Sequence, residues 1–302
     1  MAGPSIASAS GGSWASRLSV RLAENLFTVL FPSDCRICGE PLIKVSRLPV
    51  CQECLDAMLP IAGGLCAICG ERLFSSYALS GPDSEPRCGL CRRIEPTFAR
   101  AAAYGSYEGG LRELIHLLKY SGIRPAANVL GRMLAEAIAE LEPSFSEGSI
   151  AVIPVPLYRA KLHEREFNHA EVIARIATKL AGSGRLHLCT EALERKRETP
   201  SQTGLTRHQR RENVRGAFRV VSPESVKGHE VLVVDDVYTT GATVSECARV
   251  LRRAGATKVW VATVARTLKA SEQRVEIQFS GDTVAGEERG TEEIPLARAA
   301  GS

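Results

Sequence analysis

The chain has 302 residues, of which 44% are hydrophobic and 5% aromatic, and its formal net charge is +4. That length allows two domains with a full core in at least one of them, and the small net charge points to no class of partner. No stretch approaches the roughly 18 consecutive apolar residues of a membrane-spanning helix, so we expect no membrane span. Because Arg21 and Glu24 interrupt the most apolar part of the N-terminal region, we predict no signal peptide and a cytoplasmic location.

The N-terminal region is predicted to hold a disordered leader followed by one helix. Residues 1–14 are rich in Gly, Ala, Ser and Pro, a composition that cannot bury a core. Over residues 15–31, apolar side chains including Leu18, Leu22 and Leu26 recur on one helical face. We interpret this segment as a helix that docks on the protein. A helix on a membrane surface is the alternative, but its polar face carries little basic charge.

Eight of the ten cysteines lie within 57 residues and form four C-x-x-C pairs. The two-residue spacing lets both thiolates of a pair reach one tetrahedral zinc ion, with Zn–S bonds of about 2.3 Å. A disulfide framework is disfavoured because the chain shows no secretion signal. We predict two structural Zn²⁺ sites, each closed by four thiolates. Their ligands are Cys35, Cys38, Cys51, Cys54, Cys66, Cys69, Cys88 and Cys91.

Four pairs can be grouped on two ions in three ways. Consecutive grouping puts the first two pairs on one ion and the last two on the other, so that each half forms a small ribbon; interleaved grouping is the alternative. We favour consecutive grouping and assign residues 15–96 to the N-terminal helix and a double zinc ribbon. This segment is poor in core residues, and zinc contributes about 10–16 kcal/mol per site in model peptides.

Residues 97–267 show a different pattern, in which strands alternate with helices. This alternation predicts an open, mostly parallel sheet with flanking helices. The predicted strands are residues 101–107, 150–155, 186–189, 217–221, 231–234 and 258–264. The predicted helices are residues 111–120, 126–141, 168–181, 206–213 and 242–254.

The most informative stretch of this domain is residues 231–243. Four apolar residues predict a strand buried on both faces, two carboxylates follow it, and a polar turn leads into a helix. Ligands of open α/β sheets bind at the carboxyl ends of strands, and a helix N-terminus offers free N–H groups to a phosphate. The candidate residues are Asp235, Asp236, Thr239, Thr240, Gly241, Ala242 and Thr243.

The apolar strand with its two acids also occurs in receiver domains and in the metal-binding strand of NTPases. The threonine-rich turn argues against a purely structural role for this stretch. The chain has no G-x-x-x-x-G-K-[ST] motif, so it is not interpreted as a P-loop NTPase. Two acids for sugar hydroxyls beside an anion-binding turn therefore predict a site for a phosphorylated sugar.

Two basic segments are candidates for neighbouring parts of that site. Arg159, Lys161 and Arg165 follow a predicted strand and precede a helix, which predicts a second anion site; a solvated basic turn is the alternative.

Arg195, Lys196 and Arg197 open a polar, turn-rich segment that extends to residue 206. Long loops of this kind are uncommon unless they act as lids, and a solvated surface loop is the alternative.

The remaining features have ordinary explanations. His116 is interpreted as a structural or surface histidine, and Cys189 and Cys247 as core residues. Residues 268–302 carry seven acidic and four basic side chains and are predicted to form a mostly disordered tail, in which residues 275–279 could pair at a sheet edge.

Taken together, the motifs resemble those of the ComF family over roughly residues 18–265. Besides the paired cysteines they are Leu-Lys-Tyr, Ile-Pro-Val-Pro-Leu, Arg-Glu-Phe-Asn-His-Ala-Glu, Arg-x-Thr-x-x-Gln-Thr-x-Leu, Arg-x-Asn-Val-x-Gly-Ala-Phe and Val-Asp-Asp-Val-Tyr-Thr-Thr-Gly-Ala-Thr. The resemblance implies a type I phosphoribosyltransferase-like domain and a link to DNA uptake in competent bacteria. One departure is Arg165-Glu-Phe-Asn-His169, where many relatives read Arg-Gly-Phe-Asn-Gln.

The resemblance also implies roles for the candidate residues. Asp235 and Asp236 would bind the ribose hydroxyls of phosphoribosyl pyrophosphate (PRPP), and residues 239–243 its 5′-phosphate. Arg159, Lys161 and Arg165 would lie on the pyrophosphate side with Mg²⁺, and residues 195–197 would belong to the closing loop. No protein nucleophile is expected for chemistry of this class.

Three functions follow from the resemblance and the residues. The first is a DNA-handling protein with a PRPP-type site, whose partners include single-stranded DNA and other competence proteins. Residues 195–219 support it with eight basic and two acidic side chains, whereas the low aromatic content counts against stacking on single strands. The second is an active phosphoribosyltransferase with an unidentified acceptor. The third is a PRPP-sensing regulator without turnover.

Overall fold

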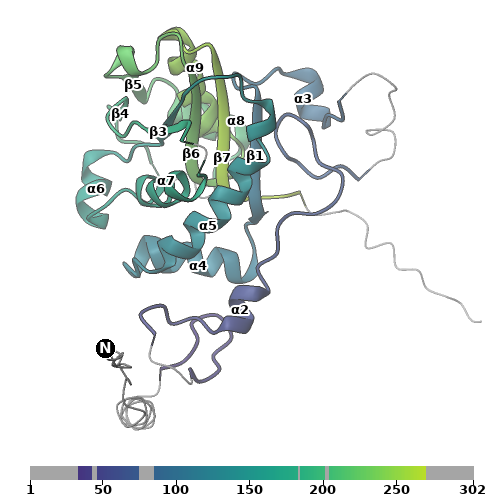
Figure 1. Ribbon diagram of the computed structural model, residues 1–302, viewed down its shortest axis with the longest axis vertical. Helices are drawn as coiled ribbons and strands as arrows, with labels where there is room; N and C mark the ends of the chain where they lie inside the picture. Colours follow the sequence, from purple (N-terminus) through teal and green to yellow (C-terminus); the bar gives the residue numbers. More distant parts are fainter. Residues whose placement is uncertain (1–32, 43–45, 75–84, 183, 201–203, 270–302) are drawn as a thin grey trace, which may run out of the picture. The chain divides into compact units, whose positions relative to one another are not determined.

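The computed structural model describes residues 33–42, 46–74, 85–182, 184–200 and 204–269 of the chain (Figure 1). The predicted leader, the helix over residues 15–31 and the edge strand over residues 275–279 lie outside the described residues. No helix in the described part of the chain is long and apolar enough to cross a bilayer.

Five parallel strands form the main sheet, in the order β1-β7-β6-β2-β3, and two antiparallel strands form a small second sheet. The strands are β1 (Arg100–Ser106), β2 (Ile150–Pro154), β3 (Leu186–Leu188), β4 (Leu193–Arg195), β5 (Phe218–Val220), β6 (Glu230–Tyr238) and β7 (Lys258–Arg266). The helices are α2 (Gln52–Asp56), α3 (Gly89–Arg93), α4 (Gly109–Tyr120), α5 (Ala126–Ala139), α6 (Arg159–Arg165), α7 (His169–Leu180), α8 (Arg207–Val214) and α9 (Ala242–Arg253), with short 3₁₀ turns at Glu142–Ser144 and Pro223–Ser225.

Helices cover both faces of the main sheet, which explains its continuous apolar strands. On one face α5 and α7 pack side by side, with α4 against α5 (Figure 1). Gly131 of α5 permits this close approach, since a Cβ there would collide with Ile176 of α7. On the other face α9 packs against β6 and β7, and α8 packs against α9. Alternate residues of β6 accordingly belong to different cores: Leu232 and Val234 to the α5 side, and Val231 and Val233 to the α9 side.

The predicted elements are confirmed with boundary shifts of a few residues. Three differences bear on the site. Arg195, expected to open a turn-rich loop, instead ends the short strand β4, which the sequence did not predict. The basic segment after β2 forms a short helix, α6, where the sequence indicated only a turn. β6 extends to Tyr238, so that Asp235 and Asp236 lie within the strand, near its carboxyl end, rather than after it. In a parallel sheet this still places both carboxylates at the carboxyl edge.

Candidate zinc centres and sugar-phosphate pocket

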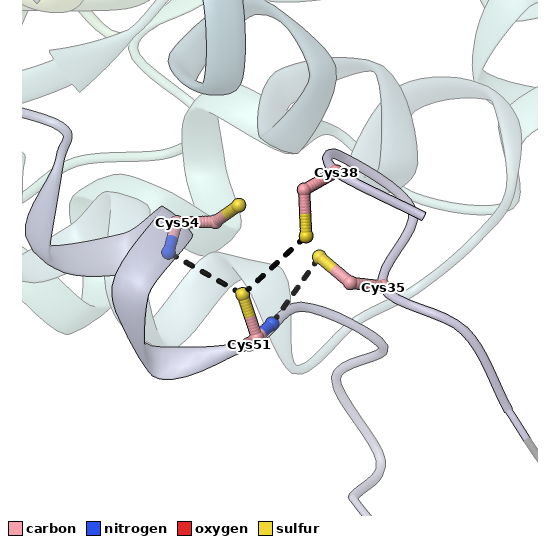
Figure 2. A group of neighbouring side chains, drawn as sticks. All are labelled: Cys35, Cys38, Cys51 and Cys54. Atoms are coloured by element: carbon pink, nitrogen blue, oxygen red, sulfur yellow. Dashed lines mark hydrogen bonds between the residues drawn. The ribbon is translucent and has the colours of Figure 1, made fainter. Parts of the chain in front are cut away.

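The first cysteine tetrad consists of Cys35, Cys38, Cys51 and Cys54, whose sulfur atoms all lie within 4.8 Å of one another (Figure 2). The Sγ atoms of Cys38 and Cys51 are 3.7 Å apart. Four sulfurs around a zinc ion at about 2.3 Å would be separated by about 3.8 Å, so the spacing fits tetrahedral zinc. The backbone N–H of Cys51 donates to Cys35 Sγ and that of Cys54 to Cys51 Sγ, at 3.4 Å each. Such bonds orient the thiolates from outside the ligand set.

The second tetrad repeats this construction with Cys66, Cys69, Cys88 and Cys91, which also lie within 4.8 Å of one another. The Sγ atoms of Cys69 and Cys88 are again 3.7 Å apart. In both tetrads a glycine follows the second cysteine in the left-handed region, Gly39 at φ 80° and Gly70 at φ 67°. Its N–H donates to the carbonyl of the first cysteine, at 2.9 and 2.8 Å respectively. These groupings confirm consecutive pairing and two closed, structural zinc sites.

The second ribbon is attached to the main sheet through buried polar contacts. The guanidinium of Arg266, at the end of β7, donates to the carbonyl of Cys69 and to Glu71 Oε2, the latter at 3.0 Å. Both side chains of this ion pair are buried, at 3% and 10% exposure. The same guanidinium lies over the ring of Tyr238, 4.8 Å from its centroid. Arg266 thus links the second ribbon to Tyr238, the last residue of β6, which directly precedes the polar turn at residues 239–243.

A pocket of about 790 Å³ opens at the carboxyl edge of the sheet, between β6, α4, the start of α7 and the β4 end. Predicted site residues that line it are Asp235, Asp236, Thr239, Thr240, Thr243, Arg165 and Arg195. Residues that the sequence did not single out for this site also line it, among them Tyr107, His116, Lys119, Tyr120, Asn168, His169 and Arg210.

The two carboxylates of the pocket differ in their charge state. Lys119 Nζ lies 2.7 Å from Asp236 Oδ1, and these side chains are only 16% and 12% exposed. Burial raises the pKa of Asp236, but the Lys119 ammonium outweighs it and holds that pKa below its ordinary value. Burial, followed by the charge of Asp236, raises the pKa of Asp235 to about 7. The pair therefore offers one firmly ionised carboxylate and one that titrates near neutral pH.

The turn after β6 packs closely against the ring of Tyr238, which is possible because the turn contains a glycine. Gly241 is the N-cap of α9 at φ 76°, and a Cβ there would collide with the ring of Tyr238. The N-terminus of α9 consequently presents backbone N–H groups and the positive end of the helix dipole beside Thr239 and Thr240. This is the geometry that a phosphate group needs.

Buried polar atoms without a partner gather in this pocket. Among the described residues, eight buried side-chain nitrogen or oxygen atoms have no hydrogen-bond partner, and five of them belong to pocket-lining residues. These five are Arg165 Nε, Asn168 Oδ1, His169 Nε2, Arg195 Nε and Thr240 Oγ1. Burial lowers the pKa of His169 to about 4, so its imidazole is neutral near pH 7. Unsatisfied buried groups cost about 1–3 kcal/mol each, and their concentration in one pocket indicates a polar ligand.

The structure brings some predicted basic residues into the pocket and leaves others outside. Arg165 lines it, with its guanidinium 5.1 Å from the centroid of Tyr120. Arg159 is 89% exposed and lies 3.9 Å from Glu194, while Lys161 pairs with Glu164 at 2.7 Å. Neither of them lines the pocket.

The predicted lid residues divide in the same way. Arg195 lines the pocket and stacks on Phe218 of β5, with 5.4 Å between guanidinium and centroid. Lys196 is exposed, and Arg197 donates to the carbonyls of Asn213 and Arg215 at 2.9 and 3.0 Å. Gly241 and Ala242 shape the turn behind the pocket.

Comparison with known proteins supports both halves of this architecture. Residues 26–95 match the double zinc ribbon domain, and residues 171–290 match the phosphoribosyl transferase domain. The DNA utilization protein YhgH of Escherichia coli O157:H7 is 32% identical over 240 residues, which cover 78% of this chain and 98% of that protein. Competence protein F of Haemophilus influenzae is 28% identical, over 72% of this chain and 96% of that protein. Competence protein ComFC of Bacillus subtilis is 23% identical, over 68% and 79%.

The chain belongs to the ComF family. The departure noted in its Arg165–His169 motif is visible in the backbone, because Glu166 ends α6 in the left-handed conformation at φ 63°. That conformation favours glycine, the residue that the resemblance to the family leads us to expect at this position. The chain keeps the turn and accepts the strain of a side chain in it.

In this ComF protein the residues that sequence reasoning missed carry weak local signals. Lys119 stands in the Leu-Lys-Tyr motif, and His169 and Asn168 in the Arg-Glu-Phe-Asn-His motif, yet neither motif indicates a role by itself. His116, for which the sequence predicts a structural or surface role, lines the pocket, and its Nε2 lies 2.9 Å from the hydroxyl of Tyr107. The contact between Lys119 and Asp236 spans 117 residues, so local spacing could not reveal it.

Proposed function

We propose that the pocket binds PRPP with Mg²⁺ and that the protein acts in the uptake and processing of DNA. The concentration of five unpartnered buried polar atoms in this pocket carries the first part of the proposal. A ligand rich in phosphate and hydroxyl oxygens would satisfy these atoms, whereas an apolar ligand would leave them unpaired.

Each part of PRPP has a matching set of residues. Asp235 and Asp236 would accept hydrogen bonds from the ribose hydroxyls, and residues 239–243 would receive the 5′-phosphate. Arg165 would face the pyrophosphate, for which a guanidinium is well suited. The carboxylates and phosphate oxygens are the hard ligands that Mg²⁺ prefers, and the ion would neutralise the pyrophosphate charge when bound.

The chemistry open to such a site is breakage of the bond between the anomeric carbon and pyrophosphate. It requires no protein nucleophile, because the sugar develops oxocarbenium character as the leaving group departs. The chain would contribute by orienting the ribose and by stabilising the leaving charge with fixed donors. His169, neutral near pH 7, would add a donor or an acceptor without adding charge.

Calorimetric titration with PRPP and Mg²⁺ tests the binding site. We expect Asp235→Asn combined with Asp236→Asn to abolish Mg²⁺-dependent binding while zinc content stays at two ions per chain. Because the second change leaves the buried Lys119 unpaired, the thermal unfolding midpoint of the variant must be recorded beside the titration. Unaltered binding by a folded variant would refute the site.

A matched pair on α6 tests the pyrophosphate side. Arg165→Ala should weaken PRPP binding by at least about tenfold, the loss expected for a charge-assisted contact. Arg159→Ala, on the same helix but outside the pocket, should have little effect. If Arg159→Ala weakened PRPP binding equally, the pyrophosphate side would include Arg159 as well as Arg165, as the sequence predicted.

The role in DNA handling rests on the relatives named for DNA utilization and competence. Single-stranded DNA is the expected partner, together with other competence proteins. A binding constant that falls steeply with salt would support contacts between phosphates and the basic residues 195–219. Failure to bind single-stranded DNA at low salt would contradict this part of the proposal and leave the PRPP site untouched.

An active phosphoribosyltransferase is the second candidate function, and the far wall of the pocket favours it. Tyr107, His116 and Tyr120 form an aromatic cluster there. The ring centroid of His116 lies 6.3 Å from that of Tyr107 and 5.3 Å from that of Tyr120. Such a wall could stack a planar acceptor. Release of pyrophosphate from PRPP distinguishes transfer from sensing: steady release on addition of acceptors supports an enzyme, and tight binding without release supports a PRPP-sensing regulator.

A further inference from the structure

A second cavity, of about 340 Å³, lies between the second zinc ribbon and the two helices α8 and α9. It is separate from the sugar-phosphate pocket, although both are lined by Thr240. We call it the ribbon cavity. Its volume falls in the range of small-molecule sites, which is about 300–1,000 Å³.

The inner walls of the ribbon cavity are apolar and partly aromatic. Leu90 and Ile94 line it from the ribbon side, Val214 from the end of α8, and Phe98 and Tyr238 from the sheet side. The last two rings meet edge to face, 6.4 Å between centroids. Ile94 is 46% exposed, a large apolar side chain left open at the cavity edge. A flat ring is the kind of group that such walls accept.

The rim of the cavity on α8 is cationic. Arg207 and Arg211 both line the cavity and are four residues apart, a spacing that puts two side chains on one face of a helix. Both are exposed, and neither has an acidic partner among the ion pairs of the described residues.

Three acidic residues line the cavity, and two of them are paired with arginines other than Arg207 and Arg211. The third, Glu95, is exposed and adjoins Ile94 on the ribbon side, and among the described residues it forms no ion pair with either arginine of the rim. Glu246 accepts from Arg249 at 2.7 and 2.5 Å and from the Gly216 N–H at 2.7 Å, which occupies both of its oxygens. Glu212 lies 3.8 Å from Arg215. Two guanidinium groups thus remain for an anionic ligand group, and their planar donors suit a phosphate.

From this combination we infer that the ribbon cavity binds a nucleotide, with its base between the apolar walls and its phosphate at Arg207 and Arg211. The base could belong to a free nucleoside monophosphate or to the 5′-phosphorylated end of a single strand. Both share the same chemistry. The site does not depend on PRPP binding, because Arg207 and Arg211 lie outside the sugar-phosphate pocket.

The wall between the two sites makes mutual influence expected. Arg210 of α8 lines the sugar-phosphate pocket while its neighbour Arg211 lines the ribbon cavity. Thr240, whose buried hydroxyl has no partner, borders both. A nucleotide in the ribbon cavity would therefore change PRPP affinity, and by linkage PRPP would change nucleotide affinity by the same factor.

The test is calorimetric titration of the zinc-loaded chain with AMP, CMP, GMP and UMP, repeated with saturating PRPP and Mg²⁺. We expect binding that persists under saturating PRPP and that weakens at least about tenfold in Arg207→Gln with Arg211→Gln. Arg132→Gln is the matched control, since Arg132 is an exposed arginine of α5 on the other face of the sheet. A second variant, Ile94→Asp, places a negative charge at the apolar edge and should weaken binding as well.

Each outcome decides the inference. Loss of nucleotide binding in Arg165→Ala would place the nucleotide in the sugar-phosphate pocket and overturn it. An apparent nucleotide dissociation constant that rises in proportion to PRPP concentration without a limit would do the same, whereas a change that levels off once PRPP is saturating is the expected coupling. Absence of binding by mononucleotides and by a 5′-phosphorylated oligonucleotide up to about 1 mM would overturn it too. Binding of both supports a site for free nucleotides. Binding of the phosphorylated oligonucleotide alone, lost on removal of its 5′-phosphate, supports a strand end.

Discussion

The two zinc ribbons share their local geometry and differ in how they join the phosphoribosyltransferase-like domain. In the first tetrad one cysteine is buried, two are half-buried and Cys38 is exposed, whereas three of the four are buried in the second. The first ribbon contacts the domain through apolar side chains, such as Met58 and Ile37 against Gly110, and through the Tyr104 hydroxyl donating to the Met58 carbonyl at 2.8 Å.

The second ribbon is built into the domain. Its Ile68 carbonyl accepts the N–H of Ala101 in β1 at 2.7 Å, and the buried Arg266–Glu71 pair fixes it to β7. A neutral contact at the edge tolerates movement more readily than a buried ion pair whose guanidinium also donates to a ribbon carbonyl. Cys35, Val50 and Met58 of the first ribbon also belong to the core cluster of α4 and α5, but no buried ion pair of the described residues fixes that ribbon to the sheet. The comparison therefore predicts that the second zinc ion contributes more to the stability of the domain than the first.

The largest effect is expected from breaking the buried ion pair. Glu71→Leu leaves the guanidinium of Arg266 buried without its counter-ion, which should lower the free energy of unfolding by about 3–5 kcal/mol. Urea unfolding measures this, and Glu71→Leu with Arg266→Met should recover most of the loss. A change below about 1 kcal/mol in the single variant would remove the distinction between the ribbons.

Loss of the first zinc ion should cost the domain far less. Cys38→Ser removes a ligand from the exposed tetrad, so zinc content should fall from two ions to one. The unfolding midpoint of the domain should change only slightly. Cys69→Ser, its counterpart in the second ribbon, should lower zinc content equally and also destabilise the domain. Equal destabilisation by the two variants would show that both ribbons are integral.

A smaller effect is expected at the neutral contact of the first ribbon. Tyr104→Phe removes the hydrogen bond to the Met58 carbonyl and should cost about 0.5–1.5 kcal/mol, the usual net value for such a bond. Zinc content should stay at two ions per chain. If this variant released the first zinc ion, the first ribbon would depend on the domain more strongly than its contacts indicate.

The smallest change in stability is expected from a substitution outside both ribbons, and it serves as a baseline for the other variants. Glu166→Gly relieves the left-handed backbone at the end of α6 and should raise the free energy of unfolding by up to about 1 kcal/mol. In the described part of the chain, the ion pair that this change removes is a 3.9 Å contact with Arg124 between largely exposed side chains. Thermal unfolding of the two proteins measures the gain; a loss would mean that the Glu166 side chain stabilises the turn.

The sequence alone determined the local features of this protein. Cysteine spacing predicted both zinc sites, because two residues between ligands suffice to form a knuckle. Apolar periodicity predicted the strands and helices, and α9 was expected at residues 242–254 and found at Ala242–Arg253. The polar turn before α9 predicted an anion site because capping and glycine conformation are properties of neighbouring residues.

The tertiary structure decided what depends on distant residues. Lys119 reaches Asp236 across 117 positions, and Arg266 reaches Glu71 across 195. Which basic residues face the pocket followed from the unforeseen helix α6, since six positions at about 3.6 residues per turn put Arg159 and Arg165 on different faces. The pairing of charges and the choice of face are set by packing between segments, and periodicity within one segment carries no information about it.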